Sequence, residues 1–420
     1  MFAGSWRWFG LVAVCAIFLG AGIFIFATLP PRTVTMATGA EGGANHELGV
    51  RYRDILARAG VHLRLLPTAG SLENLARLND SRSGVAVAFV QGGTTNRKES
   101  PDLESLGTIG YEPVWLFYRS EIGSNLQALR DRRISIGPEG SAGRIMAIEV
   151  FKRLKIEPRE LLPFPPQVAA EKMMGGDIDA AFIVTGWNSP VIQRIITASN
   201  IELASVPRAD AYVALYPYLN KLMLPAGVAD LSLNRPPSDV TLLAPKASLA
   251  VRADLHPAIQ HLLLSAATQI HSQPGIFQKA GQFPAAEAID LPLSDEAQRF
   301  YKNGRPFLQE HLPFWLATLV ERVLVVFIPL AALMYPAFKL VPQMYDWLMQ
   351  SRILRLYDEM RLIESEIKTE GPRDLAAIKA KLDYLDQRAN QLRLPTTYAS
   401  MLYTLRSHLN LVRARLGGES

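Results

Sequence analysis

Cysteine is almost absent from this sequence of 420 residues, and other signals of particular functions are missing too. The one cysteine, Cys15, lies in an apolar run, so neither a disulfide framework nor a cysteine-based metal site is expected. The formal net charge of +5 includes no block of Lys and Arg interleaved with aromatic residues, which argues against nucleic acid as a partner. Charged residues make up 20 % and apolar residues 49 %, which excludes a largely disordered chain and leaves membrane attachment open.

Catalytic and cofactor motifs are lacking as well. The seven histidines show no HExxH spacing, and the stretch "GPEGSAGR" at 137–144 lacks the Lys-Ser/Thr ending of a phosphate-binding P-loop. Neither a GxGxxG fingerprint nor a G-x-S-x-G elbow occurs. We therefore predict a protein that is not an enzyme, with no catalytic residue, no metal site and no cofactor.

Two apolar segments predict membrane attachment. Residues 9–29 carry no charge and are long enough to span a bilayer, and Trp6 and Trp8 precede them as interfacial aromatics would. A cleaved signal peptide is the alternative, but its apolar region would be shorter and would end in small residues. We expect an uncleaved anchor over residues 1–30.

Residues 312–342 hold the second candidate, for which a buried core helix is the alternative. Lys339, Arg352 and Arg355 follow its apolar core and predict a cytoplasmic C-terminal flank under the positive-inside rule. If both segments span the membrane, both termini are cytoplasmic and residues 31–311 lie outside.

Between these segments, apolar strands alternate with helical stretches, which predicts an α/β domain with open, mostly parallel sheets. The pattern of strand, glycine loop and helix at 33–58 returns at 132–154, with glycines at a constant offset of 98 residues. The recurrence predicts two similarly built lobes that share one cleft at the carboxyl ends of their strands. We expect lobe 1 at about 31–118 and 245–305, and lobe 2 at about 119–244.

The glycine loops suit a small organic anion. Each loop leads into a helix whose first backbone N–H groups are unpaired, and the helix dipole adds partial positive charge there. An anion between residues 38–46 and 140–144 would bridge the lobes, with Arg144 available for a bidentate pair. Ordinary strand-to-helix turns are the alternative.

Five stretches carry a family resemblance: "ATGAEGGANHELG", "GSLENLARL", "VAFVQ", "IGPEGSAGR" and "GDIDAAF". In this order and spacing, over about residues 33–290, they resemble the TAXI family of solute receptors for tripartite ATP-independent periplasmic (TRAP) transporters. Later stretches, among them "LPAGVADL" and "DVTLLAP", resemble a membrane-tethered branch of that family. The resemblance implies a type II periplasmic-binding-protein fold that closes on a dicarboxylate or a glutamate-like amino acid. It also implies a bacterial inner-membrane location, with the binding domain in the periplasm.

The expected ligand-binding residues lie at loop ends and helix starts. The resemblance implies Thr38, Gly39, Ser71, Asn74, Gln91, Gly140 and Ser141, and the loops add Gly42, Gly43, Asn45, Arg144 and Thr185. The sequence departs from the family pattern at three places. Asn45 and His46 replace an aromatic pair, and Trp187 replaces a smaller residue. The second loop reads Gly-Ser-Ala-Gly followed by Arg144 where the family has Gly-Ser-Gly-Thr, so a threonine hydroxyl is missing.

Residues 343–420 predict a cytoplasmic helical tail interrupted at Gly371-Pro372 and at Pro395. A bundle or coiled coil that contacts a cytoplasmic partner and a solvated tail that only fixes topology are both open. Two functions follow. A tethered receptor delivers a carboxylate to TRAP transporter membrane subunits, or a degenerate binding domain acts as a sensor or scaffold that signals through the tail.

Overall fold

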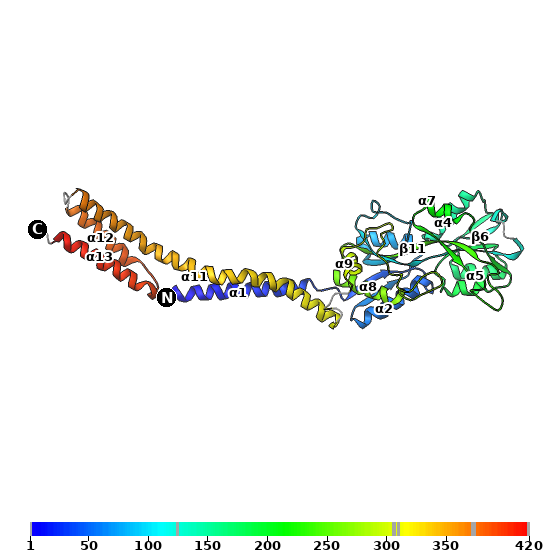
Figure 1. The fold of residues 1–420 in the computed structure, drawn as a ribbon, viewed down its shortest axis with the longest axis horizontal. Helices are drawn as coiled ribbons and strands as arrows, with labels where there is room; N and C mark the ends of the chain where they lie inside the picture. The colour runs from blue at the N-terminus through cyan, green and yellow to red at the C-terminus, as the bar shows by residue number, and fades with distance from the viewer. Residues whose placement is uncertain (1, 123–125, 305–307, 309–310, 371–374, 418–420) are drawn as a thin grey trace. The chain divides into compact units, whose positions relative to one another are not determined.

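The computed structural model describes residues 2–122, 126–304, 308, 311–370 and 375–417. The chain forms two compact units, Leu29–Thr318 and a second that joins Met1–Thr28 to Leu319–Ser420. Figure 1 draws both units as a ribbon and labels helices in each. The predicted α/β class is confirmed for the first unit, and the predicted helical C-terminal region for the second.

The first unit contains two sheets. The strands are β1 (Thr33–Ala37), β2 (His62–Leu66), β3 (Val85–Gln91), β4 (Leu103–Tyr111), β5 (Val114–Arg119), β6 (Arg133–Ser135), β7 (Glu160–Leu162), β8 (Ala180–Val184), β9 (Ile201–Leu203), β10 (Leu219–Leu224) and β11 (Val240–Arg252). The first sheet has the order β10-β11-β3-β1-β2 with β4 also paired to β11, and the second has the order β7-β6-β8-β5-β9.

Both sheets follow one plan. In each, one strand is flanked by two parallel neighbours, β2 and β3 around β1, and β7 and β8 around β6. An antiparallel strand then follows, β11 beside β3 and β5 beside β8. The sheets are therefore mixed, because strands that arrive from the other half of the unit pair antiparallel; the sequence predicted mostly parallel sheets.

Helices connect the strands and cover the sheets. They are α2 (Ala44–Arg58), α3 (Ser71–Asn79), α4 (Ala142–Leu154), α5 (Pro166–Gly175), α6 (Pro190–Ile196), α7 (Ala209–Leu215), α8 (Pro257–His271) and α9 (Asp295–Asn303), with short 3-10 turns at Ser81–Ser83, Ser120–Ile122 and Leu126–Leu129. Helix α2 shows why they form: Gly49, Tyr52 and Leu56 recur at helical spacing and are its buried residues. They join a core with Met36 of β1 and Phe89 of β3. We call this half, with β1–β4, α2, α3, α8 and α9, the first lobe.

The second lobe comprises β5–β9 and α4–α7, and its cores also include residues of β10 and of the first half of β11. The chain passes between the lobes at Glu112–Pro113, between β4 and β5, and again within β11, where Val240–Pro245 pair with β10 and Ala247–Arg252 with β3 and β4. Strand β5 pairs within the second sheet. The first crossing therefore comes earlier in the chain than residues 118–119, where the sequence predicted the boundary between the lobes. Glu112 N donates to Pro245 O at 2.9 Å, which ties the two crossings together. We call these two crossings the hinge.

The second unit consists of helices. They are α1 (Phe2–Ala27), α11 (Phe314–Glu370, which begins in the first unit), α12 (Leu375–Gln391) and α13 (Ala399–Gly417), with a 3-10 turn at Thr396–Tyr398. Helix α11 runs without interruption past Pro329, Pro336 and Pro342, so no break marks the division expected at 342–343. Helices α12 and α13 and the end of α11 bury one apolar core, with Ile353, Leu382 and Leu405 essentially inaccessible.

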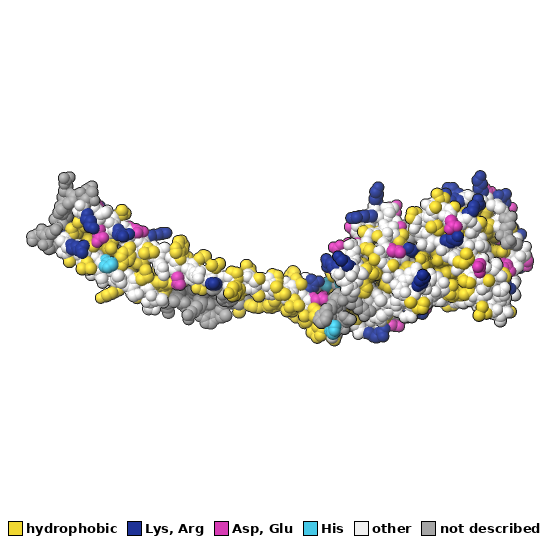
Figure 2. All heavy atoms as spheres, in the orientation of Figure 1, with side chains coloured by type: hydrophobic (Ala, Val, Ile, Leu, Met, Phe, Trp, Pro, Cys, Tyr) yellow, Lys and Arg dark blue, Asp and Glu magenta, His cyan; other side chains and the backbone are white. Residues whose placement is uncertain are grey.

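Among the residues that the structure describes, one helix is long and apolar enough to cross a membrane by length and composition, the stretch Phe314–Lys368 of α11. Only 11 % of its most apolar window is buried within the described structure, which is unlike the helix of a soluble core. Figure 2 shows hydrophobic side chains gathered along this part of α11 and along the described side chains of α1. In α1, the apolar stretch Cys15–Ala27 is shorter than a span, and Trp6 and Trp8 lie where side chains are not described. The first span therefore stays a prediction.

Candidate functional site

Two loops face each other across a cleft between the lobes. One follows β1 and leads into α2 at Ala44, and the other follows β6 and leads into α4 at Ala142, the same offset that relates the glycine motifs. The two loops and their neighbours enclose a cavity of about 130 Å³. This volume is well below the several hundred Å³ of a typical drug-sized pocket, so the cleft suits a solute of only a few heavy atoms.

Five helices begin at this cavity. The first residues or N-caps of α2, α3, α4, α5 and α6 all belong to its lining. Four of these helices have no side-chain cap, and only α4 is capped, by Ser141 Oγ. Backbone N–H groups at helix starts lack intrahelical acceptors, and each helix dipole places partial positive charge there.

Several of these N–H groups are open to a ligand. At the first two positions of these helices, the lining residues whose backbone N–H has no acceptor among the described residues are Ala44, Asn45, Ser71, Ala142, Gly143 and Gln167. They come from both lobes, from α2 and α3 in the first and from α4 and α5 in the second. Convergent N–H donors at helix N-termini form a site for an anion such as a carboxylate.

The charge of the lining is unusual for an anion site. Among the described residues that line the cavity, none is Lys, Arg or His, and the one acidic side chain is Glu112 of the hinge. Asn45 Nδ2 donates to Glu112 Oε1 at 3.0 Å. Burial raises the pKa of the Glu112 carboxyl, and the hydrogen bond from Asn45 offsets part of that rise.

Hydrogen bonds join the two lobes across the cleft. Gly140 O of the second lobe accepts from Leu72 N at 3.2 Å and from Glu73 N at 3.4 Å at the start of α3. Gln167 Nε2 of α5 donates to Gly42 O at 3.0 Å. At Gly70, where φ is +138°, an added Cβ would lie 3.3 Å from the Cα of Ser141, so only glycine allows this approach. The structure therefore shows the lobes closed on the cavity.

The structure brings seven of the twelve expected site residues into the lining. They are Gly39, Gly43, Asn45, Ser71, Gln91, Ser141 and Thr185. Ser71 Oγ accepts from Gln91 N at 3.0 Å, which fixes the hydroxyl beside the end of β3. The side chain of Gln91 makes no hydrogen bond to another described residue and is free to meet a ligand.

Asn74 lies outside the lining and has a structural role. Its side chain is 1 % exposed, and Nδ2 donates to Thr38 O at 3.0 Å and to Phe89 O at 2.8 Å. Its Oδ1 accepts from Thr68 Oγ1 at 2.6 Å. The sequence predicted that the Asn74 amide contacts a ligand. In the structure this amide instead hydrogen-bonds to the segments that hold the backbone N–H donors of the first lobe.

The other four expected residues also lie outside the lining. Thr38 is fully buried, and its hydroxyl lies 3.1 Å from His46 Nδ1. The carbonyl oxygens of Gly42 and Gly140 accept hydrogen bonds from the opposite lobe. Arg144 Nη1 donates to Gly137 O at 3.3 Å, so its guanidinium braces the second loop. A bidentate pair between Arg144 and a ligand stays a prediction.

Sequence reasoning missed Glu112 and Gln167. Glu112 lies between two apolar strands and directly before Pro113, a position that only the crossing between lobes makes part of the cleft. Gln167 follows Pro165 and Pro166 at the start of α5, and a Pro pair before a helical stretch is a helix-start signal. In the described parts of the chain, no group of three or more His, Cys, Asp and Glu lies close enough to hold a metal ion.

Solved structures similar to this chain share little sequence with it. MatC from Rhodopseudomonas palustris with bound malate is 14 % identical over 71 % of this chain and 98 % of that chain, with a TM-score of 0.40. A TctC solute-binding protein from Polaromonas is 18 % identical over 59 % and 86 %, with a TM-score of 0.36. An ancestral arginine-binding protein bound to arginine is 11 % identical over 58 % and 93 %, with a TM-score of 0.38. Because these TM-scores are low, the three structures support no conclusion about the site.

The sequence profile of the NMT1-like family matches residues 36–304. The match begins in β1 and ends after α9, so it includes both sheets, the hinge and every residue of the cleft lining. This chain belongs to the NMT1-like family.

Proposed function

We propose that this protein is a membrane-attached, extracytoplasmic solute receptor of the TAXI type, whose two lobes close around one small carboxylate for TRAP-type transport. The observation that carries the proposal is the convergence of five helix N-termini, with open N–H donors from both lobes, on one small cavity. A type II periplasmic-binding-protein arrangement of two lobes on a hinge gives such a site its closing motion. Binding without chemistry fits a lining that has no nucleophile paired with a base.

Glu112 restricts the solutes that fit. Because the lining holds no basic side chain, an ionised Glu112 would repel a purely anionic solute. A protonated Glu112 donates a hydrogen bond to a carboxylate, whereas an ionised Glu112 pairs with an ammonium group. Of the two classes that the sequence indicates, a glutamate-like amino acid satisfies both the N–H donors and Glu112 at neutral pH, and a dicarboxylate requires the protonated acid.

Attachment to the membrane is supported by the exposed apolar stretch of α11 and by the apolar run of α1. We propose that residues 31–311 lie outside the cytoplasmic membrane and that α12 and α13 lie in the cytoplasm. The folded apolar core shared by α11, α12 and α13 favours a second function, in which solute-dependent closure is read by a cytoplasmic partner of this bundle. A chain that ends before α12 and still supports solute uptake would favour transport alone.

The cleft is tested by removing one backbone donor. Ala44 is the first residue of α2, where proline fits the helix and removes only an N–H that has no intrahelical partner. Its neighbour Gly43 has φ −81° and ψ 159°, which is compatible with a following proline. Ala44→Pro should weaken solute binding roughly 10-fold or more, the loss expected for one charge-assisted hydrogen bond.

The matched control is Asp295→Pro, which makes the same change at the first residue of α9, away from the cleft. Calorimetric titration of the purified chain with L-glutamate, malate and succinate measures the affinities. Equal affinities for the two variants and the unaltered chain, or no binding of any such solute, would refute the proposal.

A further inference from the structure

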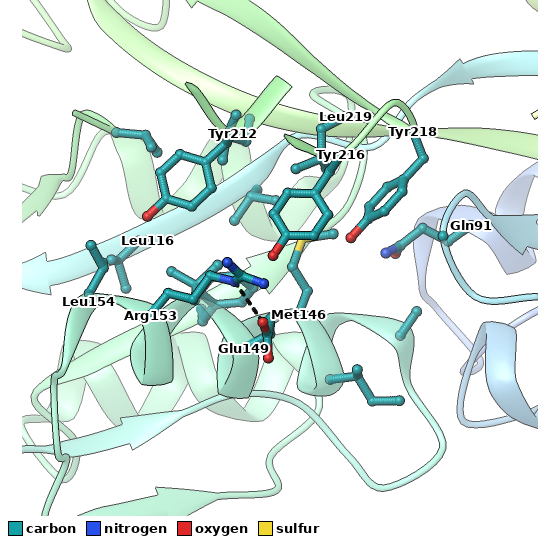
Figure 3. Close-up of a pocket in the computed structure, with 18 of the residues that line it drawn as sticks. Gln91, Leu116, Met146, Glu149, Arg153, Leu154, Tyr212, Tyr216, Tyr218 and Leu219 are labelled. Carbon is teal, nitrogen blue, oxygen red and sulfur yellow. Dashed lines mark hydrogen bonds and ion pairs between the residues drawn. The ribbon is translucent and has the colours of Figure 1, made fainter. Parts of the chain in front are cut away.

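A second, larger cavity lies beside the cleft. It has a volume of about 330 Å³ between α4, strand β5 and the segment from α7 to β10 of the second lobe, and Leu72 and residues 91–94 of the first lobe line part of it. Figure 3 shows Leu116 and Leu154 at one end and Gln91 of the first lobe at the other. Its volume falls in the size range of ligand pockets.

The wall of this cavity is largely apolar. Its apolar lining residues come from the second lobe and, at Leu72, from α3 of the first: Leu72, Val114, Leu116, Leu126, Ala142, Ile145, Met146, Val150, Leu154, Phe182, Ala204, Val206, Pro207, Leu219 and Leu243. Leu116 and Phe182 are themselves core residues of the second sheet. Such a wall favours a ligand whose body is a hydrocarbon chain or an aromatic ring.

Three tyrosines are among the polar residues of the lining. Tyr212, Tyr216 and Tyr218 direct their hydroxyl groups toward α4 (Figure 3). The hydroxyl oxygen of Tyr216 is buried and has no hydrogen-bond partner among the described residues. Buried hydroxyl groups are nearly always paired, so this one calls for a polar atom inside the cavity.

A cation stands beside that hydroxyl. The Arg153 guanidinium lies 5.1 Å from the centroid of the Tyr216 ring, and its Nε donates to Glu149 Oε1 at 2.7 Å. Both charged side chains are about half exposed, 48 % and 46 %, so they form the rim of the cavity. The two Nη groups of Arg153 make no hydrogen bond to another described residue, which leaves the outer edge of the guanidinium open to an acceptor.

We infer that this cavity binds an apolar monocarboxylate, such as an arylalkanoate or a medium-chain fatty acid. The hydrocarbon body fills the apolar interior, and the carboxylate accepts from Arg153 Nη and from the Tyr216 hydroxyl. The site is separate from the anion cleft in volume and chemistry, although Gln91, Ala142 and Phe182 contribute to both walls. It does not depend on the proposed function of the cleft.

The experiment uses the full chain in lipid nanodiscs, because detergent tails would compete for an apolar cavity. Calorimetric titration with 3-phenylpropionate and octanoate measures binding, and 3-phenylpropanol serves as the uncharged analogue. Arg153→Gln should weaken both carboxylates about 10-fold and leave the alcohol unchanged. Tyr216→Phe, which removes one oxygen atom, should weaken 3-phenylpropionate severalfold.

Two tryptophan substitutions on α4 test the location. Met146→Trp fills the cavity and should abolish binding, whereas Ile148→Trp adds the same ring at a position that is 44 % exposed and outside the lining. Ala44→Pro, which changes the cleft, should leave 3-phenylpropionate binding unaltered. The inference is overturned if the unaltered chain binds neither carboxylate, or if Met146→Trp and Ile148→Trp bind alike. Loss of binding in Ala44→Pro with retention in Arg153→Gln would also overturn it, because the probe would then occupy the cleft.

Discussion

Replacement of Asn74 by alanine should destabilise the two-lobed unit without removing a ligand contact. The side chain is 1 % exposed and makes three hydrogen bonds, two to backbone carbonyl groups and one from Thr68 Oγ1. At a net contribution of about 1 kcal/mol per bond, the loss is about 3 kcal/mol. The buried carbonyl and hydroxyl groups left without Asn74 add to this cost, so roughly 3–5 kcal/mol is expected.

Asn79→Ala provides the matched control on the same helix. Asn79 is exposed, and its Nδ2 donates to Ser100 Oγ at 2.9 Å. Its loss should cost about 1 kcal/mol or less, because water replaces an exposed partner.

Gln91→Ala provides the opposite contrast. Gln91 lines the cleft, and its side chain makes no hydrogen bond to another described residue, so its removal should weaken solute binding and change stability little. Asn74→Ala and Gln91→Ala together therefore distinguish a residue that supports the site, Asn74, from a residue that contacts the ligand, Gln91.

Urea unfolding of Leu29–Thr318, followed by tryptophan fluorescence, measures the three free energies of unfolding. Trp115, which is fully buried in the second lobe, and Trp315 beside the first report on this unit. If Asn74→Ala and Asn79→Ala lose equal stability, the buried amide does not brace the loops. If Asn74→Ala instead lowers only the solute affinity, the ligand role that the sequence indicates would be restored.

Three further predictions concern titration and backbone strain. Burial raises the pKa of Glu112, so the folded state keeps this proton to a higher pH than the unfolded state does. The free energy of unfolding should therefore fall as the pH rises above the ordinary carboxyl pKa, and Glu112→Gln should remove this pH dependence in unfolding experiments. Burial lowers the pKa of His271 from 6.5 to about 4, so the unfolded state binds more protons in that window; the unaltered unit should lose about 3 kcal/mol relative to His271→Gln between pH 6.5 and 4. At Gly107, φ is +110° and an added Cβ would lie 2.5 Å from Ala285 O, so Gly107→Ala should cost roughly 3 kcal/mol of unfolding free energy. Gly110→Ala on the same strand, where a Cβ meets nothing within 4 Å, should cost under about 1 kcal/mol, and equal costs would contradict the strain argument.

Local sequence patterns predicted the features of the fold that depend on neighbouring residues, such as where strands, loops and helices begin. The glycine loops before α2 and α4, and their equivalence at a constant offset, follow from strand and helix periodicity together with glycine positions. The order of strands, and the antiparallel partners β11 and β5, depend on chain crossings between lobes. Periodicity within one stretch of sequence contains no information about such pairings.

The lack of long-range information in local patterns also explains which site residues the sequence predicted correctly. Gly39, Ser71 and Gln91 lie where a strand ends or a helix begins, and these positions reach the cleft by topology. Asn74 lies one turn into α3, and its side chain turns back toward the ends of β1 and β3. A helix start in the sequence does not reveal which of its polar side chains faces the ligand and which supports the loop behind it.

No basic side chain lines the cleft among the described residues, and this sets how the proposed site would bind a carboxylate. Backbone donors at helix starts can hold an anion without a mobile cation, and such donors from both lobes line this one cavity. Glu112 lies on the hinge itself, where its backbone N–H bonds to Pro245 O and its carboxyl meets Asn45 at the start of α2. In the proposed function, a solute that pairs with Glu112, or that binds its protonated form, therefore acts on the hinge and couples closure to solute selection. Glu112→Gln should then remove the part of the pH dependence of dicarboxylate affinity that comes from this carboxyl, and leave the part that comes from the solute's own carboxyl groups.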